Sequence, residues 1–161
     1  MTEREFNACV DAHADGVYRF ILKNLGHVED ARDIVQSAFE KMWKNRGSVV
    51  NATAKSYLFT VAYHQMIDHI RKNKRFQFSE GLPEDIRVER SVQPGAQGAL
   101  DKALEQLTPL QKSLVLLKDY EGYNYEEIGK IMALSESQVK VYLHRARLIL
   151  RTYIGNPQNI I

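Results

Sequence analysis

The sequence predicts an all-α fold made of two small helical domains joined by a flexible linker. In the clear segments, apolar residues recur every 3 to 4 positions, about the 3.6-residue period of a helix with one buried side. Only four prolines interrupt the 161 residues, and long stretches contain no helix breaker. With 44% apolar and 26% charged residues, the composition is that of an ordinary folded protein with a buried core.

The distribution of charge divides the chain at residues 76–98. This segment has 2 basic and 4 acidic residues, a net charge of 2 − 4 = −2, and it combines two prolines and three glycines without a sustained helical period. Residues 1–75 carry 12 − 9 = +3, and residues 99–161 carry 8 − 7 = +1. We therefore expect one domain at 1–75, a linker at 76–98 and a second domain at 99–161.

Several classes of protein do not fit this composition. No segment approaches the roughly 20 apolar residues of a membrane-spanning helix, so no membrane insertion is expected. The first residues, MTEREF, lack the apolar character of a secretory signal, and we expect a cytoplasmic protein. Cys9 is the single cysteine and cannot form an intrachain disulfide, and no Cys/His cluster has zinc-ligand spacing. We expect no metal and no cofactor.

Three helices are expected in the first domain. Thr2 and Glu5 have the spacing of a capping box and begin a helix that is either continuous or broken midway. The second should span Val28 to Asn45, and the third should start near Thr53 and continue past Ile70. Their expected buried stripes are Val28, Ala31, Val35, Ala38, Phe39 and Met42 in the second, and Leu58, Val61, Ala62, Met66 and Ile70 in the third.

A basic run follows the third stripe. Four of the five residues from Arg71 to Arg75 are positive, namely Arg71, Lys72, Lys74 and Arg75. Such a run would suit a phosphate backbone, and its contacts would make binding depend on salt. The alternative is a solvated helix C-terminus whose positive charges offset the helix dipole.

The second domain carries three helix-start signals in succession. Thr108 and Gln111, with Pro109 between them, have capping-box spacing, as do Asn124 with Glu127 and Ser135 with Gln138. A turn of about three residues joins the last two helices, and the second is basic on one side. This pattern is typical of a helix-turn-helix, in which we expect Gly129 to let the second helix approach the first closely. The alternative is an ordinary αα-hairpin.

In a helix-turn-helix, the first residues of the second helix enter the major groove. Glutamine can pair with adenine and lysine with guanine, whereas arginines late in the helix more often contact phosphates. The candidates for DNA contact are therefore Glu136, Ser137, Gln138 and Lys140, followed by His144, Arg145 and Arg147.

Three segments carry a family resemblance that spans nearly the whole chain. They are residues 29–39 (EDARDIVQSAF) with Trp43, residues 57–62 (YLFTVA) with 67–71 (IDHIR), and residues 107–147. In this order they resemble regions two and four of the extracytoplasmic-function (ECF) group of bacterial sigma factors. These are the dissociable promoter-recognition subunits of RNA polymerase.

The resemblance implies a binding protein without enzymatic activity. Its implied partners are core RNA polymerase, through the clamp coiled coil and the flap, promoter DNA and an anti-sigma factor. Asp33, Gln36 and Trp43 map to the polymerase surface, while we expect Phe39 to lie in the core. The implied contacts with the minus-ten element are Ser48, Val49, Val50 and Asn51 beside a captured base, with the basic run on the adjacent backbone. The helix-turn-helix would read the minus-35 element.

The sequence departs from the family pattern at three positions. Tyr57 and His64 stand where the family has tryptophan and asparagine, and Ala133 stands where the turn usually has glycine.

Two other functions are compatible with an all-α chain of this kind. One alternative function is a stand-alone helix-turn-helix regulator that dimerises on a palindrome. The other is an all-α enzyme that uses Asp68, His69 or His64.

Overall fold

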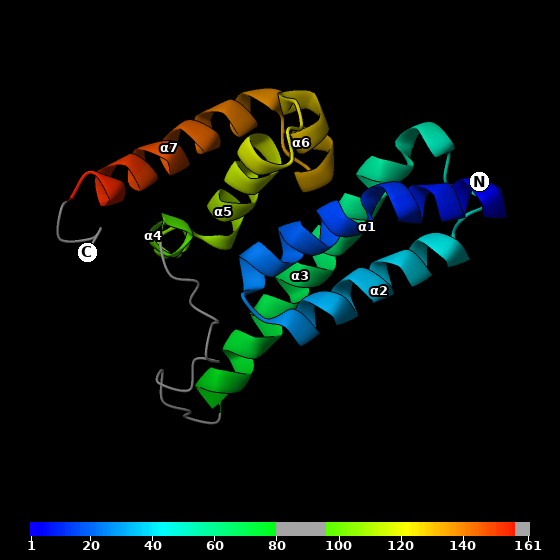
Figure 1. Ribbon diagram of the computed structural model, residues 1–161, viewed down its shortest axis with the longest axis horizontal. Coiled ribbons are helices and arrows are strands. Elements are labelled where there is room, and N and C mark those ends of the chain that lie inside the picture. Colours follow the sequence, from blue (N-terminus) through cyan, green and yellow to red (C-terminus); the bar gives the residue numbers. More distant parts are fainter. Residues whose placement is uncertain (80–95, 157–161) are drawn as a thin grey trace. The chain divides into compact units, whose positions relative to one another are not determined.

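The computed structural model describes residues 1–79 and 96–156, and the chain divides into two compact units, Met1–Arg90 and Ser91–Ile161 (Figure 1). All regular elements in these described residues are helical, which confirms the all-α prediction. The predicted linker lies largely outside the described residues. At its edges the chain is helical, over 76–79 and from residue 96 onward.

The described part of the first unit contains α1 (Glu3–Leu25), α2 (Val28–Lys44) and α3 (Ala54–Ser79), with a short 3-10 turn at Asn51–Thr53. The three α-helices pack against one another (Figure 1). The predicted capping box starts α1, because the Glu5 N–H donates to Thr2 Oγ1 at 3.1 Å and the Thr2 N–H donates to Glu5 Oε1 at 3.1 Å. The helix runs without a break to Gly26, whose φ of 69° ends it.

The core of the first unit follows the predicted stripes with shifts along α2. Val17, Phe20 and Ile21 of α1 meet buried side chains of the other two helices, and the Phe20 and Phe59 rings lie 5.8 Å apart. Val28 is exposed and Phe39 is half-buried, contrary to prediction, whereas Ile34 is buried. Both α1 and α3 contact α2. The positions of these two helices therefore decide which side chains of α2 are buried, more than the apolar periodicity of α2 does.

The second unit contains α4 (Ala96–Leu104), α5 (Pro109–Val115), a π-helical turn (Leu116–Tyr120), α6 (Tyr125–Met132) and α7 (Glu136–Ile154). All three predicted capping boxes form, at the starts of α5, α6 and α7. Each stabilises a helix start through two hydrogen bonds between residues three apart. The core comprises Leu104, Leu107, Leu114, Leu117, Ile128, Ile131, Val139 and Leu143.

The turn between α6 and α7 depends on a left-handed residue and a close backbone approach. Ala133 has φ 57° and ψ 46°, the conformation that glycine adopts at lower cost. The Leu134 N–H donates to the Gly129 carbonyl at 2.9 Å. A Cβ on Gly129 would lie 2.6 Å from the Leu134 carbonyl oxygen. Gly129 is therefore required by the turn itself, and not by the approach of the second helix that we predicted.

Replacing Ala133 with glycine is expected to stabilise the second unit by about 0.5–1 kcal/mol. The left-handed conformation costs a non-glycine residue about 1–2 kcal/mol, and the greater freedom of glycine in the unfolded chain offsets about 0.5–1 kcal/mol of this gain. Urea unfolding followed by circular dichroism at 222 nm would measure the change. An unfolding midpoint equal to or below that of the wild type would contradict this reading of the turn.

Candidate functional sites

The outward side of α2 presents the residues predicted to contact a protein partner. Asp33 and Gln36 are exposed, and the Gln36 Nε2 donates to Glu40 Oε1 at 3.4 Å. Trp43 is half-buried, with the Phe6 ring at 4.9 Å in an edge-on arrangement and the Arg46 guanidinium 3.9 Å from its ring centre. Its ring is therefore held in place while part of it remains accessible.

An apolar groove of about 670 Å³ lies between α1 and α2. Phe39 lines this groove instead of entering the core, which corrects the prediction that it is a core residue. The packing of α1 on α2 leaves its ring half-covered, beside Trp43. The groove thus joins an apolar surface to the polar side of α2, and its lining residues are Phe6, Val10, Tyr18, Arg32, Val35, Gln36, Phe39, Glu40, Trp43 and Lys44.

Of the four residues predicted to contact the minus-ten element in the loop before α3, three are exposed and one is buried. Ser48, Val50 and Asn51 are exposed, and the Val50 side chain is 63% exposed although it is apolar. Val49 is only 5% exposed, because its side chain turns into the first unit. Val49 therefore anchors the loop and does not lie on the surface that DNA would contact, which corrects its assignment.

The basic run lies inside α3. The helix continues to Ser79, so Arg71, Lys72 and Lys74 are not a helix terminus that offsets the dipole. All three side chains are exposed, and Arg71 lies 4.0 Å from Asp68. The side chain of Arg75 is outside those described.

The loop precedes α3, whereas the basic run begins well along the helix. At a rise of 1.5 Å per residue, Arg71 is about 25 Å along the axis from the start of the helix. A base held by Asn51 and a phosphate held by Arg71 would therefore belong to nucleotides several positions apart, given about 3.4 Å per nucleotide along one strand. The run is therefore distant from the loop, contrary to the expectation that it would hold the backbone next to a base captured there.

The exposed side of α7 brings together the predicted DNA contacts. Glu136, Ser137, Gln138, Lys140, His144 and Arg145 are exposed, while Val139, Leu143 and Ala146 face the core. The Gln138 Oε1 accepts the Ser135 N–H at 2.9 Å as part of the cap. A bidentate pair with adenine would need both ends of this amide, so it would compete with the cap.

Arg147 differs from the other predicted contacts because it is bound within the chain. Its Nη2 donates to Asp119 Oδ1 at 2.6 Å and its Nε donates to Oδ2 at 3.4 Å, which joins α7 to the π-helical turn. The hydrogen bonding to the Asp119 carboxylate raises the pKa of the guanidinium above its ordinary value, and Tyr125 acts in the same direction. Asp119 thus occupies the Nε and Nη2 edge of the guanidinium, which a phosphate could use only when this pair opens.

Lys118 and Tyr125 also belong to this surface, although neither was predicted as a contact. The Lys118 ammonium lies 4.8 Å from the centre of the Tyr125 ring, and the Lys140 ammonium lies 5.4 Å from the same ring. Two cations from different elements thus converge on one aromatic side chain. Because the three residues belong to the π-helical turn, α6 and α7, no local spacing in the sequence could indicate the cluster.

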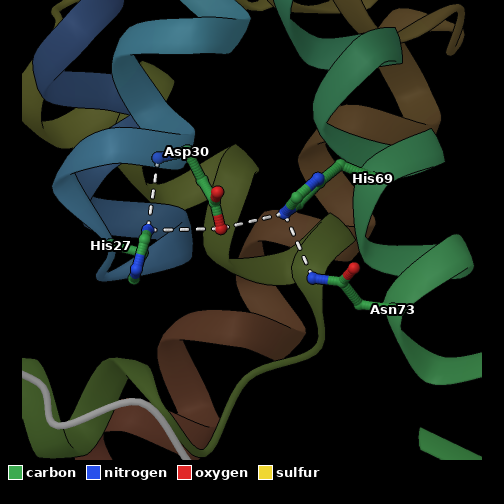
Figure 2. Close-up of polar contacts among 4 residues, drawn as sticks. All are labelled: His27, Asp30, His69 and Asn73. Carbon is green, nitrogen blue, oxygen red and sulfur yellow. Dashed lines mark hydrogen bonds and ion pairs between the residues drawn. The ribbon is translucent and has the colours of Figure 1, made fainter. Parts of the chain in front are cut away.

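A polar cluster joins the start of α2 to α3 (Figure 2). Asp30 Oδ2 lies 3.3 Å from His27 Nδ1 and 3.2 Å from His69 Nε2, which in turn lies 3.1 Å from Asn73 Nδ2. His27 also accepts the Asp30 N–H at 3.2 Å as the helix cap. His69, which the enzyme alternative invoked, is thus engaged in holding two helices together. His64 and Asp68 are exposed.

Over 1–79 and 96–156, no helix is both long and apolar enough to cross a membrane. Within the same ranges, no group of three or more His, Cys, Asp or Glu side chains is arranged to hold a metal ion.

Comparison with known proteins matches both units to families. Residues 9–76 match the Sigma-70 region 2 family, and residues 97–150 match Sigma-70, region 4. The ECF RNA polymerase sigma factor SigE of Mycolicibacterium smegmatis is 31% identical over 91% of this chain, which spans 60% of that protein. SigL of Mycobacterium tuberculosis is 30% identical over 89% of this chain and 85% of its own length.

Solved structures show the same fold. The sigma factor RpoE of Bartonella quintana, in complex with the anti-sigma factor NepR, has a TM-score of 0.80 at 22% identity and covers 96% of this chain and 99% of its own. CnrH, in complex with the cytosolic domain of CnrY, has a TM-score of 0.73 at 19% identity, covering 96% and 90%. From the two matched regions and the sequence relatives together, we conclude that the chain belongs to the ECF group of bacterial RNA polymerase sigma factors.

Proposed function

We propose that this sigma factor acts through three separate surfaces, one for core RNA polymerase and two for promoter DNA. The polymerase surface is the exposed side of α2 with Asp33, Gln36 and Trp43, continued by the apolar groove beside it. The observation that carries this assignment is the juxtaposition of exposed polar side chains with a partly covered Trp43 and Phe39. A polar rim around an apolar centre is the usual composition of a protein interface.

The two DNA surfaces lie on different units. In the first unit, Ser48, Val50 and Asn51 would contact the opened minus-ten element, and the basic run would hold its backbone several nucleotides away. In the second, the exposed side of α7 would read the minus-35 element from the major groove. The net charge of the chain is only +2, which favours weak duplex binding until core polymerase presents both units together.

Assignment to this family also suggests where the protein works and which further partners it has. We propose that the chain performs no covalent chemistry, works in the cytoplasm, and is divided functionally at 1–75, 76–98 and 99–161. An anti-sigma factor is a further proposed partner, since the sigma factor RpoE, which has the same fold, was solved in complex with the anti-sigma factor NepR. The flap of the polymerase is proposed to contact the second unit.

Run-off transcription with purified bacterial core polymerase on fragmented genomic DNA tests this proposal. Adding the protein should produce discrete new transcripts, and it should co-migrate with core polymerase on a sizing column. If core polymerase does not bind and the protein alone shifts a palindromic DNA as a dimer, the stand-alone regulator is correct instead.

A further inference from the structure

On the exposed side of α7, which we propose to bind DNA, two cationic side chains form ion pairs with carboxylates of the same chain. Arg147 is held by both oxygens of Asp119, and the Lys140 ammonium lies 3.7 Å from Glu136 Oε1. The two pairs differ in kind. Glu136 and Lys140 are four residues apart on one helix, whereas Asp119 and Arg147 are 28 residues apart and join two elements.

The position of Asp119 resembles that of a bound phosphate. A carboxylate that accepts from two nitrogens of a guanidinium uses the same donors that a DNA phosphate would use. The surroundings are cationic, since Lys118 and Lys140 both approach the Tyr125 ring next to this pair. Lys118, Lys140 and Arg147 together carry three positive charges, against two negative charges on Asp119 and Glu136.

The pair is suited to exchange because it is partly exposed. The side chains of Arg147 and Asp119 are 40% and 41% exposed, so water and salt weaken their attraction. A backbone phosphate of DNA bound by α7 can compete for the guanidinium without crossing a buried layer. Arg147 would then move from a carboxylate to a phosphate, with its charge unchanged.

We propose that Asp119 is an internal competitor of DNA, which holds Arg147 in the free sigma factor and yields it to a backbone phosphate when α7 enters the major groove. This inference rests on the proposed function, because it requires α7 to be the DNA-reading helix. Its consequence is that the free chain binds DNA less tightly than its cations would permit, while core polymerase overcomes the difference by holding the unit at the promoter.

A double-mutant cycle on the full chain tests the proposal. The probe is a fluorescein-labelled 20-base-pair duplex of mixed sequence, since a phosphate contact does not depend on base sequence. In fluorescence anisotropy at low salt, Asp119→Asn should tighten binding about threefold to fivefold. The matched control, Glu126→Gln, removes an exposed carboxylate that pairs with Lys130 and should change binding less than twofold. In an Arg147→Gln background, Asp119→Asn should have no larger effect than the control.

The outcomes separate this inference from the function on which it rests. If Asp119→Asn and Glu126→Gln have equal effects, or if the effect of Asp119→Asn persists without Arg147, the competitor role is wrong. If neither Lys140→Gln nor Arg147→Gln weakens binding, α7 is not the DNA helix, and the proposed function fails with it. Circular dichroism of each variant would show that the second unit remains folded.

A second measurement needs no change at Asp119. In the wild-type chain, the NMR signal of the Arg147 Nε–Hε group should shift when the same duplex is added, because its acceptor changes from Asp119 to a phosphate. A signal that stays in place while binding saturates would overturn the proposal.

Discussion

Alanine at position 129 is expected to destabilise the second unit by about 1 kcal/mol and to weaken the DNA recognition that we propose for α7. The added Cβ would lie 2.6 Å from the Leu134 carbonyl oxygen, a backbone atom that cannot move without displacing the turn. Such overpacking typically costs about 1–3 kcal/mol, and the cost exceeds the gain of about 1 kcal/mol in helix propensity. Since the Leu134 N–H also bonds to the Gly129 carbonyl, the orientation of α7 should change as well.

Urea unfolding followed by two spectroscopic signals can show which unit the Gly129→Ala substitution destabilises. Trp43 is the single tryptophan and belongs to the first unit, so its fluorescence reports urea unfolding of that unit, whereas circular dichroism reports both. Gly129→Ala should lower the circular-dichroism transition of the second unit and leave the Trp43 transition unchanged. Ala133→Gly, four residues along the same turn, is the matched control and should act in the opposite direction. An unchanged midpoint for Gly129→Ala would show that the turn is not closely packed.

Neutralising the basic run of α3 is expected to produce the largest loss of function. Replacement of Arg71, Lys72 and Lys74 by glutamine removes three exposed cations without shortening the helix. If each contacts a phosphate of duplex DNA, the log–log slope of binding against salt should decrease in magnitude by about 0.9 per contact, so roughly 2.7 in all. Run-off transcription should fall more than tenfold, while affinity for core polymerase, which we propose to depend on the α2 surface, should stay the same.

A charge-matched variant distinguishes contact from general electrostatics. Glutamine in place of Arg4, Lys41 and Lys102 removes the same charge from exposed positions on α1, α2 and α4. This control should retain the salt slope of the wild type. Equal losses of transcription in both triple variants would mean that only net charge matters, and the assignment of the run to promoter DNA would be wrong.

The class of fold, the starts of four helices and the family could all be predicted from the sequence. The capping boxes at Thr2, Thr108, Asn124 and Ser135 all form, because each depends on two residues only three positions apart. The family motifs could be recognised for a similar reason, because each motif consists of residues that are close together in the sequence. The left-handed backbone at Ala133 was also predictable, because the resembled family usually has glycine at this position of the turn.

Which side chains of a helix or loop are covered, and which charged groups form pairs, depends on the packing of whole elements. Periodicity gives the direction of a side chain about its own helix axis, but neighbouring elements decide whether that direction is buried. This is why Phe39 lines a groove and Val49 is buried. Likewise, Asp119 meets Arg147 across 28 residues, and Asp30 meets His69 across 39. Such contacts depend on how whole helices pack, which no local spacing encodes.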